Sequence, residues 1–552
     1  MKNRILDGSL ASIIKWGKMD HFYSVPKRLI PLLEETLGRI EGKTEQLIDL
    51  KEISFDVPNP QMKKEEIDVL GEIVGKSHIS TSKYDRVRLS CGYSYYDVIR
   101  LRLGEIGNFP DVVVFPKKHE EIQEILRLSH EKRIPVVPVG GRTGVTQATE
   151  TKFGGIALDL TRHMNKILEL DEKSLTIRCQ AGIMLPDLEA YLNKQGFMMG
   201  HFPQSFEHSS LGGSIATRGA GQQSTKYGKI EDMVFGLRLA TPIGEKKTVE
   251  LPASAMGPDL VRVIAGSEGT LGIITEALMK IQSYLPETRE FSSFLFKDFA
   301  GGLAAIREIM QYGVTPAVVR LSDAEETQIL TQLETTSEKK RSLISRSVEK
   351  AAKKYLKRKG YMENPCLCIL EFEGEKEIVK LTQSKSHQIC KIWGGFYLGK
   401  RPAKEWYTNR FELPYLRDDL MDLGVLVDTL ETAAPWNRIE RLHKSVRKVL
   451  CNHVPIIMTH CSHCYREGAS LYFTYLAKRL NGQESQQILD IQNDVLAVLE
   501  EENCALSHHH GIGRAFKKWF VHHAEADVIV ALKRLWDPHN IMNPGNLIDF
   551  NP

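Results

Sequence analysis

Three glycine-rich segments are the parts of this sequence best suited to holding an anionic ligand. They are PVGGRTG (138–144), TRGAG (217–221) and GSEGTLG (266–272). Glycine has no Cβ, so several backbone N–H groups can converge on a pyrophosphate without a steric clash. One such loop is an ordinary turn. Three of them in one region, each beside an expected strand or helix, predict a dinucleotide-binding domain.

Two common nucleotide-binding motifs are missing from the sequence. No G-x-G-x-x-G opens a strand–helix unit, and no G-x-x-x-x-G-K-[ST] occurs. A Rossmann domain that binds NAD and a P-loop ATPase are therefore both disfavoured.

A triple histidine near the C-terminus offers proton-transfer chemistry. His508, His509 and His510 stand in SHHHGIG, on an expected loop. Imidazole titrates near neutral pH and is the commonest general acid or base in enzymes. Alternate side chains of an extended run face the same side, so the three histidines cannot all act alike.

The cysteines indicate reduced thiols rather than disulfides or a metal centre. The chain has nine cysteines, an odd number, and they are scattered. Cys461 and Cys464 form one C-x-x-C without a second pair at zinc-finger spacing. We therefore expect no metal, and two small, half-buried residues beside a strand.

The pattern of strands and helices divides the chain into four regions. Residues 1–90 are helix-rich, and residues 91–283 mix apolar strands such as DVVVFP and IPVVPV with short helices and the glycine loops. Residues 284–505 predict a single sheet backed by helices, placed as a cap domain. Residues 506–552 return to glycine and histidine chemistry. The expected class is α+β.

Composition excludes several classes of function. The 552 residues carry a formal net charge of only +3, which does not support nucleic-acid binding. No apolar run is long enough to span a bilayer, and the first residues do not resemble a signal peptide. We expect a cytoplasmic protein. The basic stretch 337–359 favours a solvated helix, with a surface for anionic lipid headgroups as the alternative.

The order of the glycine motifs resembles a known family. PVGGRTG, HFPQSFEHSSLGGSIATRGAG, YGKIEDMV and GSEGTLGIITE follow one another as in the FAD domain of the vanillyl-alcohol-oxidase type. The resemblance covers residues from about 90 to the end. It implies FAD between two α+β subdomains, with a cap over the flavin ring. No placed His, Cys or Tyr signals a covalent link, so we expect non-covalent FAD.

The resemblance assigns the FAD contacts to four segments. Arg142 stands where the family has a small residue, and Gln204 replaces an acidic one; whether Arg142 points outward or offsets phosphate charge stays open. The predicted cofactor-binding residues are Pro138, Val139, Gly140, Gly141, Arg142, Thr143, Gly144, Gln204, Ser205, Phe206, Glu207, His208, Ser209, Ser210, Thr217, Arg218, Gly219, Ala220, Glu268, Gly269, Thr270, Leu271, Gly272, Ile273 and Ile274.

Within this fold, the cap motifs resemble the alkylglycerone-phosphate synthase family. Tyr472 in SLYFTY lies 36 residues before His508, and Arg417 lies 18 residues before Pro435, close to the family spacings. Arg320 in VVRLSD matches a further family arginine, and IIKWGKMDHF resembles its N-terminal Trp-Gly segment. The H-x-G-D-G-N-x-H motif of D-lactate and glycolate dehydrogenases is replaced by SHCYREGASLYF.

The reaction that the resemblance implies replaces the acyl group of acyl-dihydroxyacetone phosphate by a fatty alcohol. The flavin serves as a covalent handle, and there is no net redox change. The resemblance assigns proton transfer to Tyr472, His508, His509 and His510. It assigns the phosphate or the departing carboxylate to Arg417, whose planar fork binds such groups, and substrate binding to Arg320.

Lipid-like substrates also require an apolar tunnel and access to a membrane. We therefore expect peripheral membrane contact, and leave the assembly open between a monomer and a homodimer. Two other functions stay open at this point. One is an FAD-linked oxidase or dehydrogenase of a small 2-hydroxy acid, and the other is a flavin-binding protein without turnover.

Overall fold

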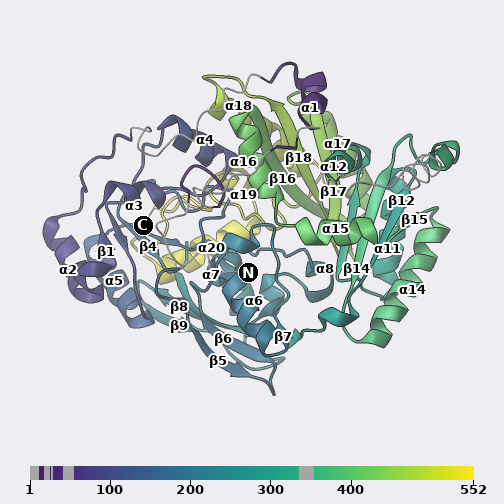
Figure 1. Cartoon of the computed structure of the whole chain (residues 1–552). Coiled ribbons are helices and arrows are strands. Elements are labelled where there is room, and N and C mark those ends of the chain that lie inside the picture. The colour runs from purple at the N-terminus through teal and green to yellow at the C-terminus, as the bar shows by residue number, and fades with distance from the viewer. Residues whose placement is uncertain (1–11, 18–24, 27–28, 41–54, 335–353, 552) are drawn as a thin grey trace.

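The computed structural model describes residues 12–17, 25–26, 29–40, 55–334 and 354–551 (Figure 1). Most of the basic stretch 337–359, up to residue 353, and residues 18–22 of the Trp-Gly segment lie outside the described residues. The described chain forms sheets of four, five, two and seven strands. Helices cover them, which confirms the predicted α+β class.

The four-stranded sheet carries the first glycine segment at the end of a buried strand. Its order is β1-β2-β4-β3, and β2, β4 and β3 run parallel. Their uninterrupted apolar residues suit a parallel sheet that is covered on both faces. Helices α2 and α5 pack on it. The elements are β1 (Ile79–Ser80), β2 (Val112–Val114), β3 (Val136–Val139), β4 (Ile156–Asp159), α2 (Lys64–Val74), α3 (Lys83–Arg88), α4 (Tyr95–Leu103) and α5 (His119–Lys132).

The five-stranded sheet is antiparallel, in the order β5-β6-β10-β8-β9. Its buried face packs on short helices that the other two glycine segments border. The strands are β5 (Ile167–Asp171), β6 (Thr176–Gln180), β8 (Val234–Thr241), β9 (Gly244–Lys247) and β10 (Ile273–Lys280), with β7 (Phe197–Met198) and β11 (Gln282–Ser283) as a separate pair. The helices are α6 (Leu185–Lys194), α7 (Leu211–Ala216), α8 (Ser224–Tyr227), α9 (Ile230–Met233) and α10 (Leu260–Ile264).

The cap is built on one seven-stranded antiparallel sheet, whose strands run from teal to yellow-green in Figure 1. Its strand order is β15-β12-β14-β13-β17-β18-β16. The predicted single sheet is therefore present, but β17, which carries HCSHC, was not expected as a strand. The strands are β12 (Glu290–Phe296), β13 (Val318–Ser322), β14 (Cys366–Phe372), β15 (Phe396–Gly399), β16 (Val425–Pro435), β17 (Ile456–Cys464) and β18 (Gly468–Lys478).

Side-chain alternation gives the cap sheet two different faces. Leu471, Phe473 and Tyr475 of β18 point into the main core, whereas Tyr472 and Thr474 face the opposite side, toward a cavity. The core face is covered by α11 (Phe299–Tyr312), α14 (Lys376–Ile392), α17 (Trp436–Leu450) and α18 (Glu484–Glu501). The cavity side meets α1 (Leu29–Leu37), α12 (Ala324–Glu334), α15 (Arg401–Asn409) and α16 (Leu413–Asp422).

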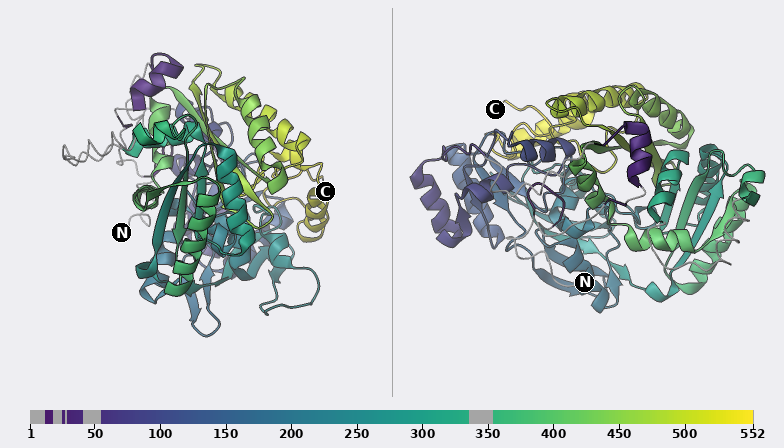
Figure 2. Two further views of the ribbon diagram at one scale, coloured as in Figure 1. Left: turned by 90° about the vertical axis from the view of Figure 1, so that its right-hand side faces the viewer. Right: turned by 45° about the horizontal axis from the view of Figure 1, so that its top comes forward.

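The C-terminal segment, yellow in Figures 1 and 2, runs back to the region of the glycine segments. It contains α19 (Lys517–Phe520) and α20 (Ala524–Trp536), and residue Met542 forms a parallel bridge with Val136 of β3. The buried Lys533 ammonium donates to the carbonyls of Thr270 and Met542 and pairs with Asp537 at 2.7 Å. These bonds fix the segment beside the third glycine loop.

None of the helices in the described part of the chain combines the length and the apolar content needed to cross a bilayer.

Candidate active site

One large cavity lies between the glycine segments and the inner face of the cap sheet. The first region contributes loops that include Gly140, Ser210 and Gly269, and the cap contributes Arg320 and Tyr472. The cavity continues toward α1, where its wall is apolar. The fold therefore brings all three glycine segments and the cap motifs to one place.

The first glycine segment forms a cradle that suits a pyrophosphate. None of the backbone N–H groups of residues 140–145 donates a hydrogen bond to another described residue. A Cβ on Gly141 would lie 1.8 Å from the carbonyl oxygen of His208, and one on Gly140 would lie 2.3 Å from Ser210 Oγ. Glycine is thus required for the close approach of two loops, and the free N–H groups fit an anion.

Most of the predicted cofactor-binding residues line the cavity. Those on its wall are Pro138, Val139, Gly140, Gly141, Arg142, Thr143, Gly144, Gln204, Ser205, Ser209, Ser210, Thr217, Gly219, Ala220, Glu268, Gly269, Gly272, Ile273 and Ile274.

Six predicted cofactor-binding residues lie off the cavity wall and support the loops instead. Glu207 and His208 both hydrogen-bond the hydroxyl of Tyr415, on the cap helix α16, at 3.0 and 3.2 Å. The other four are also engaged elsewhere: Phe206 stacks on Phe411, Arg218 pairs with Glu231, and Thr270 and Leu271 are fully buried.

Arg142 points inward rather than outward. It is 6% exposed, its Nε donates to the carbonyl of Cys91 at 3.3 Å, and its guanidinium lies 5.0 Å from the ring centre of Tyr93. Its Nη2 has no hydrogen-bond partner among the described residues. A buried cation with one free N–H on the cavity wall suits an anionic ligand.

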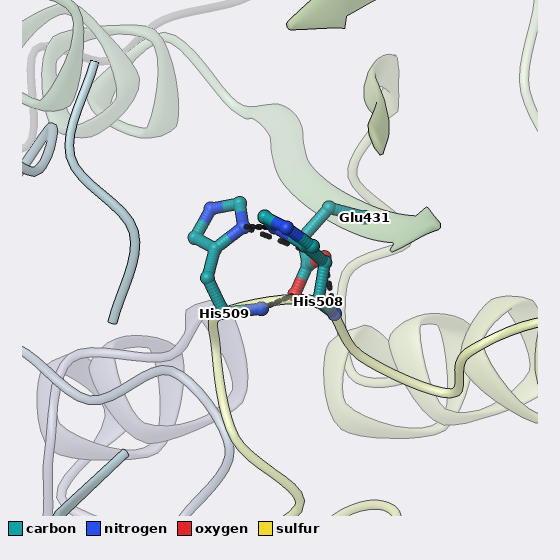
Figure 3. A group of neighbouring side chains, drawn as sticks. All are labelled: Glu431, His508 and His509. Carbon is teal, nitrogen blue, oxygen red and sulfur yellow. Dashed lines mark hydrogen bonds and ion pairs between the residues drawn. The ribbon is translucent and has the colours of Figure 1, made fainter. Parts of the chain in front are cut away.

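A buried carboxylate on the cap sheet holds the histidine loop (Figure 3). Glu431, on β16, accepts the backbone N–H groups of His508, His509 and His510 at 2.6, 3.1 and 2.9 Å. It also accepts the Ser507 hydroxyl at 2.6 Å. Burial alone would raise the pKa of Glu431, but the hydrogen-bonded loop that carries the histidines and the Ser507 hydroxyl holds it well below its ordinary value.

A second buried carboxylate holds the other end of the same loop. Glu268, in the third glycine segment, accepts the N–H groups of Ile512 and Gly513 at 2.7 and 2.9 Å. Burial raises the pKa of Glu268 to about 7, and these hydrogen bonds oppose the shift. The loop of residues 507–513 is thus fixed by one carboxylate from each side of the cavity.

The three histidines take different positions. His509 and His510 line the cavity, whereas His508 does not and instead hydrogen-bonds the Tyr465 hydroxyl at 2.9 Å. Burial lowers the pKa of His510 below its ordinary value and lowers those of His508 and His509 well below it. The two cavity-facing imidazoles are therefore neutral at physiological pH, the form that accepts a proton.

Tyr472 stands at the centre of the cap face. Its neighbours across the sheet are Glu431 on β16 and His460 on β17. The ring stacks on His460 with 5.0 Å between centroids and lies 5.6 Å from the His510 ring. Burial raises the pKa of the Tyr472 hydroxyl to about 12, so Tyr472 stays protonated and can donate a hydrogen bond or a proton.

Both predicted substrate arginines line the cavity. Arg320, on β13, pairs with Glu326 at 2.8 Å, and Glu326 also contacts His460 at 2.9 Å. The Nε of Arg320 is buried without a hydrogen-bond partner among the described residues. Arg417, on α16, pairs with the adjacent Asp418 and donates to the carbonyl of Tyr93 at 2.8 Å. The two arginines place cations on the cap side of the cavity.

Several residues of the site were not predicted from the sequence. Glu431 was not among the predicted site residues, and neither were His460 and His463, although both histidines line the cavity. His201 also lines it, and both of its ring nitrogens lack a hydrogen-bond partner within the described chain. A carboxylate inside the apolar strand VLVDTLETAAP was the available signal for Glu431.

Two residue clusters have spacings that are also found in metal sites. Glu431, His508 and His509 place ligand atoms within 4.8 Å of one another, but the Nδ1 atoms of the two histidines hydrogen-bond each other at 3.0 Å. The carboxylate is occupied by the loop N–H groups. The Cys461 and Cys464 sulfurs lie 3.8 Å apart in the core, and all nine cysteines are free thiols.

Comparisons with known proteins agree with this site. Residues 110–273 match the model of the FAD binding domain, and residues 285–547 match the model of the C-terminal domain of FAD linked oxidases. The alkyldihydroxyacetonephosphate synthase of Dictyostelium discoideum is 36% identical over 484 residues, which cover 85% of this chain and 78% of that protein. The chain belongs to the alkyldihydroxyacetonephosphate synthase family.

The fold agrees with the family along the whole chain. A solved structure of an alkyldihydroxyacetonephosphate synthase superposes with a TM-score of 0.82 at 30% identity and covers 97% of this chain and 98% of its own. The predicted two-subdomain FAD-binding fold and the FAD cofactor are thereby confirmed. The glycolate oxidase subunit GlcD of Bacillus subtilis is more distant, at 27% identity over 80% of this chain and 89% of its own. The hydroxy-acid oxidase alternative is therefore the less supported one.

Proposed function

We propose that this enzyme exchanges the acyl group of an acyl-dihydroxyacetone phosphate for a fatty alcohol and so forms the ether bond of an ether lipid. The observation that carries the proposal is the arrangement of His509, His510 and Tyr472, which face the same cavity as the glycine cradle. The relatives that match most of this chain at 30–36% identity are alkyldihydroxyacetonephosphate synthases.

The cofactor side of the site follows from the cradle. The free N–H groups of residues 140–145 and the Arg142 guanidinium would hold the pyrophosphate of FAD. When bound, FAD supplies the electron-accepting ring on which an exchange without net redox change depends. No histidine, cysteine or tyrosine is assigned to a covalent link.

The cap side supplies the proton chemistry. A base must remove a proton from the carbon beside the substrate ketone, and His509 and His510 are the neutral imidazoles that face the cavity. Tyr472, which stays protonated, would donate a hydrogen bond to an oxygen of the leaving carboxylate. His508 lies behind them and supports the loop through Tyr465.

The arginines supply the fixed positive charge. A phosphate monoester and a departing carboxylate are both anions that a planar guanidinium binds with two parallel hydrogen bonds. Arg417 and Arg320 both stand on the cap side of the cavity. We assign the phosphate or the carboxylate to Arg417 and a further substrate contact to Arg320.

The apolar end of the cavity suits a long alkyl chain. Its wall is formed by helices α1, α12 and α16 and by the cavity face of the cap sheet. Burial of each methylene is worth about 0.8 kcal/mol, so a chain of this kind contributes strongly to binding. The lining side chains are Leu29, Leu33, Ile329, Leu330, Leu413, Leu416, Leu420, Val427, Met458 and Leu476.

The proposed reaction can be tested on the purified holoenzyme. The protein is mixed without oxygen with palmitoyl-dihydroxyacetone phosphate, the flavin absorbance is recorded, and hexadecanol is added before product analysis. We expect loss of the oxidised flavin bands, their return with the alcohol, and an alkyl ether product. An unchanged spectrum without ether would refute the proposal, and bleaching by a 2-hydroxy acid would favour the oxidase alternative.

We further propose that the enzyme works in the cytoplasm at the surface of a membrane. Its free thiols suit a reducing compartment, and its lipid substrates reside in bilayers. Co-sedimentation with liposomes of anionic lipids tests the contact. Protein that stays in the supernatant at low ionic strength would contradict it, and recovery of pelleted protein by salt would show that the contact is electrostatic.

A further inference from the structure

A β-bulge in strand β17 turns one histidine toward the cavity. Along this strand Met458, His460 and Ser462 face the cavity, and Cys461 faces the core. A regular strand would place residue 463 on the core side with Cys461. The register with β18 shifts between Ser462 and Cys464, so Cys464 returns to the core and His463 joins Ser462 on the cavity wall.

The bulge requires an uncommon backbone conformation at His463. Its φ is +49°, in the left-handed region that non-glycine residues seldom adopt. Bulges concentrate beside active sites, where they re-aim a side chain, and a strained residue persists only where its surroundings impose it. This geometry also explains the C-x-x-C spacing, because both cysteines flank the bulge and pack in the core.

The imidazole of His463 is buried but incompletely paired. It is 9% exposed, and its Nδ1 has no hydrogen-bond partner among the described residues. A buried polar atom without a partner carries a desolvation cost that a ligand can remove. The ring also lies on the wall of the catalytic cavity, where a bound molecule can contact the imidazole.

The neighbours of His463 place it at the reacting end of the cavity. Its ring centre lies 5.1 Å from that of His509 and 5.4 Å from that of His508. The apolar wall that suits the alkyl chain includes other residues of the same strand, such as Met458, several positions away. The polar partner of His463 is therefore expected in the head group of the substrate.

We propose that His463 is a further substrate-contact residue, whose imidazole hydrogen-bonds an oxygen of the three-carbon head group of acyl-dihydroxyacetone phosphate. The inference rests on the proposed function for the identity of the substrate. It assigns His463 a role separate from proton transfer, which belongs to the His509 and His510 side of the cavity.

The test compares ligand affinities in four proteins: wild type, His463→Ala, His463→Asn and His387→Ala. Asparagine tolerates a positive φ and keeps an amide N–H, so it separates the hydrogen bond from the strain. His387 is a matched control, since it is a partly buried cap histidine that bonds Ser292 outside the cavity. Each holoenzyme is titrated with palmitoyl-dihydroxyacetone phosphate, and each apoprotein with FAD.

We expect His463→Ala to weaken binding of palmitoyl-dihydroxyacetone phosphate about tenfold or more, with FAD affinity within about twofold of wild type. His463→Asn is expected to recover part of the loss, and His387→Ala to match wild type. Substrate affinity within about twofold of wild type in His463→Ala would overturn the inference, and so would an equal loss of FAD affinity, which would make His463 a flavin contact. If the wild type binds this ligand but forms no ether, the proposed reaction is refuted and the inference about His463 is not.

Discussion

At the scale of single residues, the site depends on buried groups whose charge is set by their surroundings. Glu431 is kept ionised by the loop that it holds, while His509 and His510 are kept neutral by burial. A fixed anion beside neutral bases stabilises an imidazolium when one forms, as proton transfer requires. The division of charge thus prepares the histidines to accept a proton.

Replacing Glu431 with Gln is expected to lower kcat for ether formation on the order of 100-fold, because a small displacement of catalytic groups is costly. The amide presents an NH2 group to loop N–H groups that need acceptors, at a cost of roughly 1–3 kcal/mol. FAD content should stay near wild type. Glu250→Gln, at a partly exposed ion pair with Arg178, is the control. Wild-type kcat in Glu431→Gln would contradict the positioning role.

The pH dependence follows from the same histidines. The folded-state pKa values of His509 and His510 lie below the ordinary 6.5, so the neutral, basic form of each imidazole persists to lower pH. The value of kcat/KM should therefore fall only below pH 6.5. Below pH 6.5 the unfolded chain also binds protons that the folded site excludes, so the free energy of unfolding should fall as the pH falls. Rate profiles and urea unfolding between pH 5 and 8 measure both; an acid limb centred above 6.5 would contradict the assignment.

At the scale of elements, short loops and one strand face build the site. The first glycine segment follows an apolar strand whose pattern is plain in the sequence, and the other two follow short helices. Their meeting point was predictable from the motifs. Strand β17 was not, because THCSHC lacks the apolar alternation of a strand, and its bulge depends on pairing with β18. Glu431 was missed for a related reason. The loop that it holds begins at Ser507, 76 residues further along the chain, so the contact forms only when the chain folds.

Gly141→Ala should weaken FAD binding. The new Cβ would lie 1.8 Å from the His208 carbonyl, and the two loops would have to separate. Overpacking of this kind costs roughly 1–3 kcal/mol, which corresponds to FAD affinity about tenfold to a hundredfold lower. Gly107→Ala is the control, because nothing lies within 4 Å of its added Cβ. Retention of full flavin content after dialysis would show that the first segment is not the cradle.

The apolar end of the cavity predicts a change in chain-length preference. Leu33 of α1 is fully buried on the cavity wall, so Leu33→Trp should shorten the space available. We expect kcat/KM to fall about tenfold more for a 16-carbon acyl chain than for an 8-carbon chain. Thr36→Trp, on the exposed side of the same helix, should leave the ratio unchanged. Equal losses for both chain lengths would argue against an alkyl tunnel at α1.

At the scale of the whole molecule, the FAD-binding region, the cap and the C-terminal segment share one cavity. The cap helix α16 reaches the second FAD segment through the Tyr415 hydroxyl, and Lys533 fixes the C-terminal segment to the third. A ligand that lies across these contacts binds the folded chain and not the unfolded one. The cofactor should therefore act as a structural element as well as a reagent.

Removal of FAD is accordingly expected to lower the melting temperature by several degrees. A ligand at 1,000 times its dissociation constant stabilises the native state by about 4 kcal/mol. Differential scanning fluorimetry of apoprotein with increasing FAD measures the effect, and NAD serves as the control dinucleotide. A melting temperature that does not respond to FAD would mean that the cofactor does not bridge these regions.

The two carboxylates that hold the histidine loop come from opposite halves of the chain, Glu431 from the cap and Glu268 from the FAD-binding region. Neither half alone can order the loop at both ends. The catalytic histidines consequently exist as a defined site only in the fully docked molecule, and parting of the halves would release at least one end before either half unfolds. Catalytic activity therefore requires that the cap and the FAD-binding region are docked, and neither domain is active by itself.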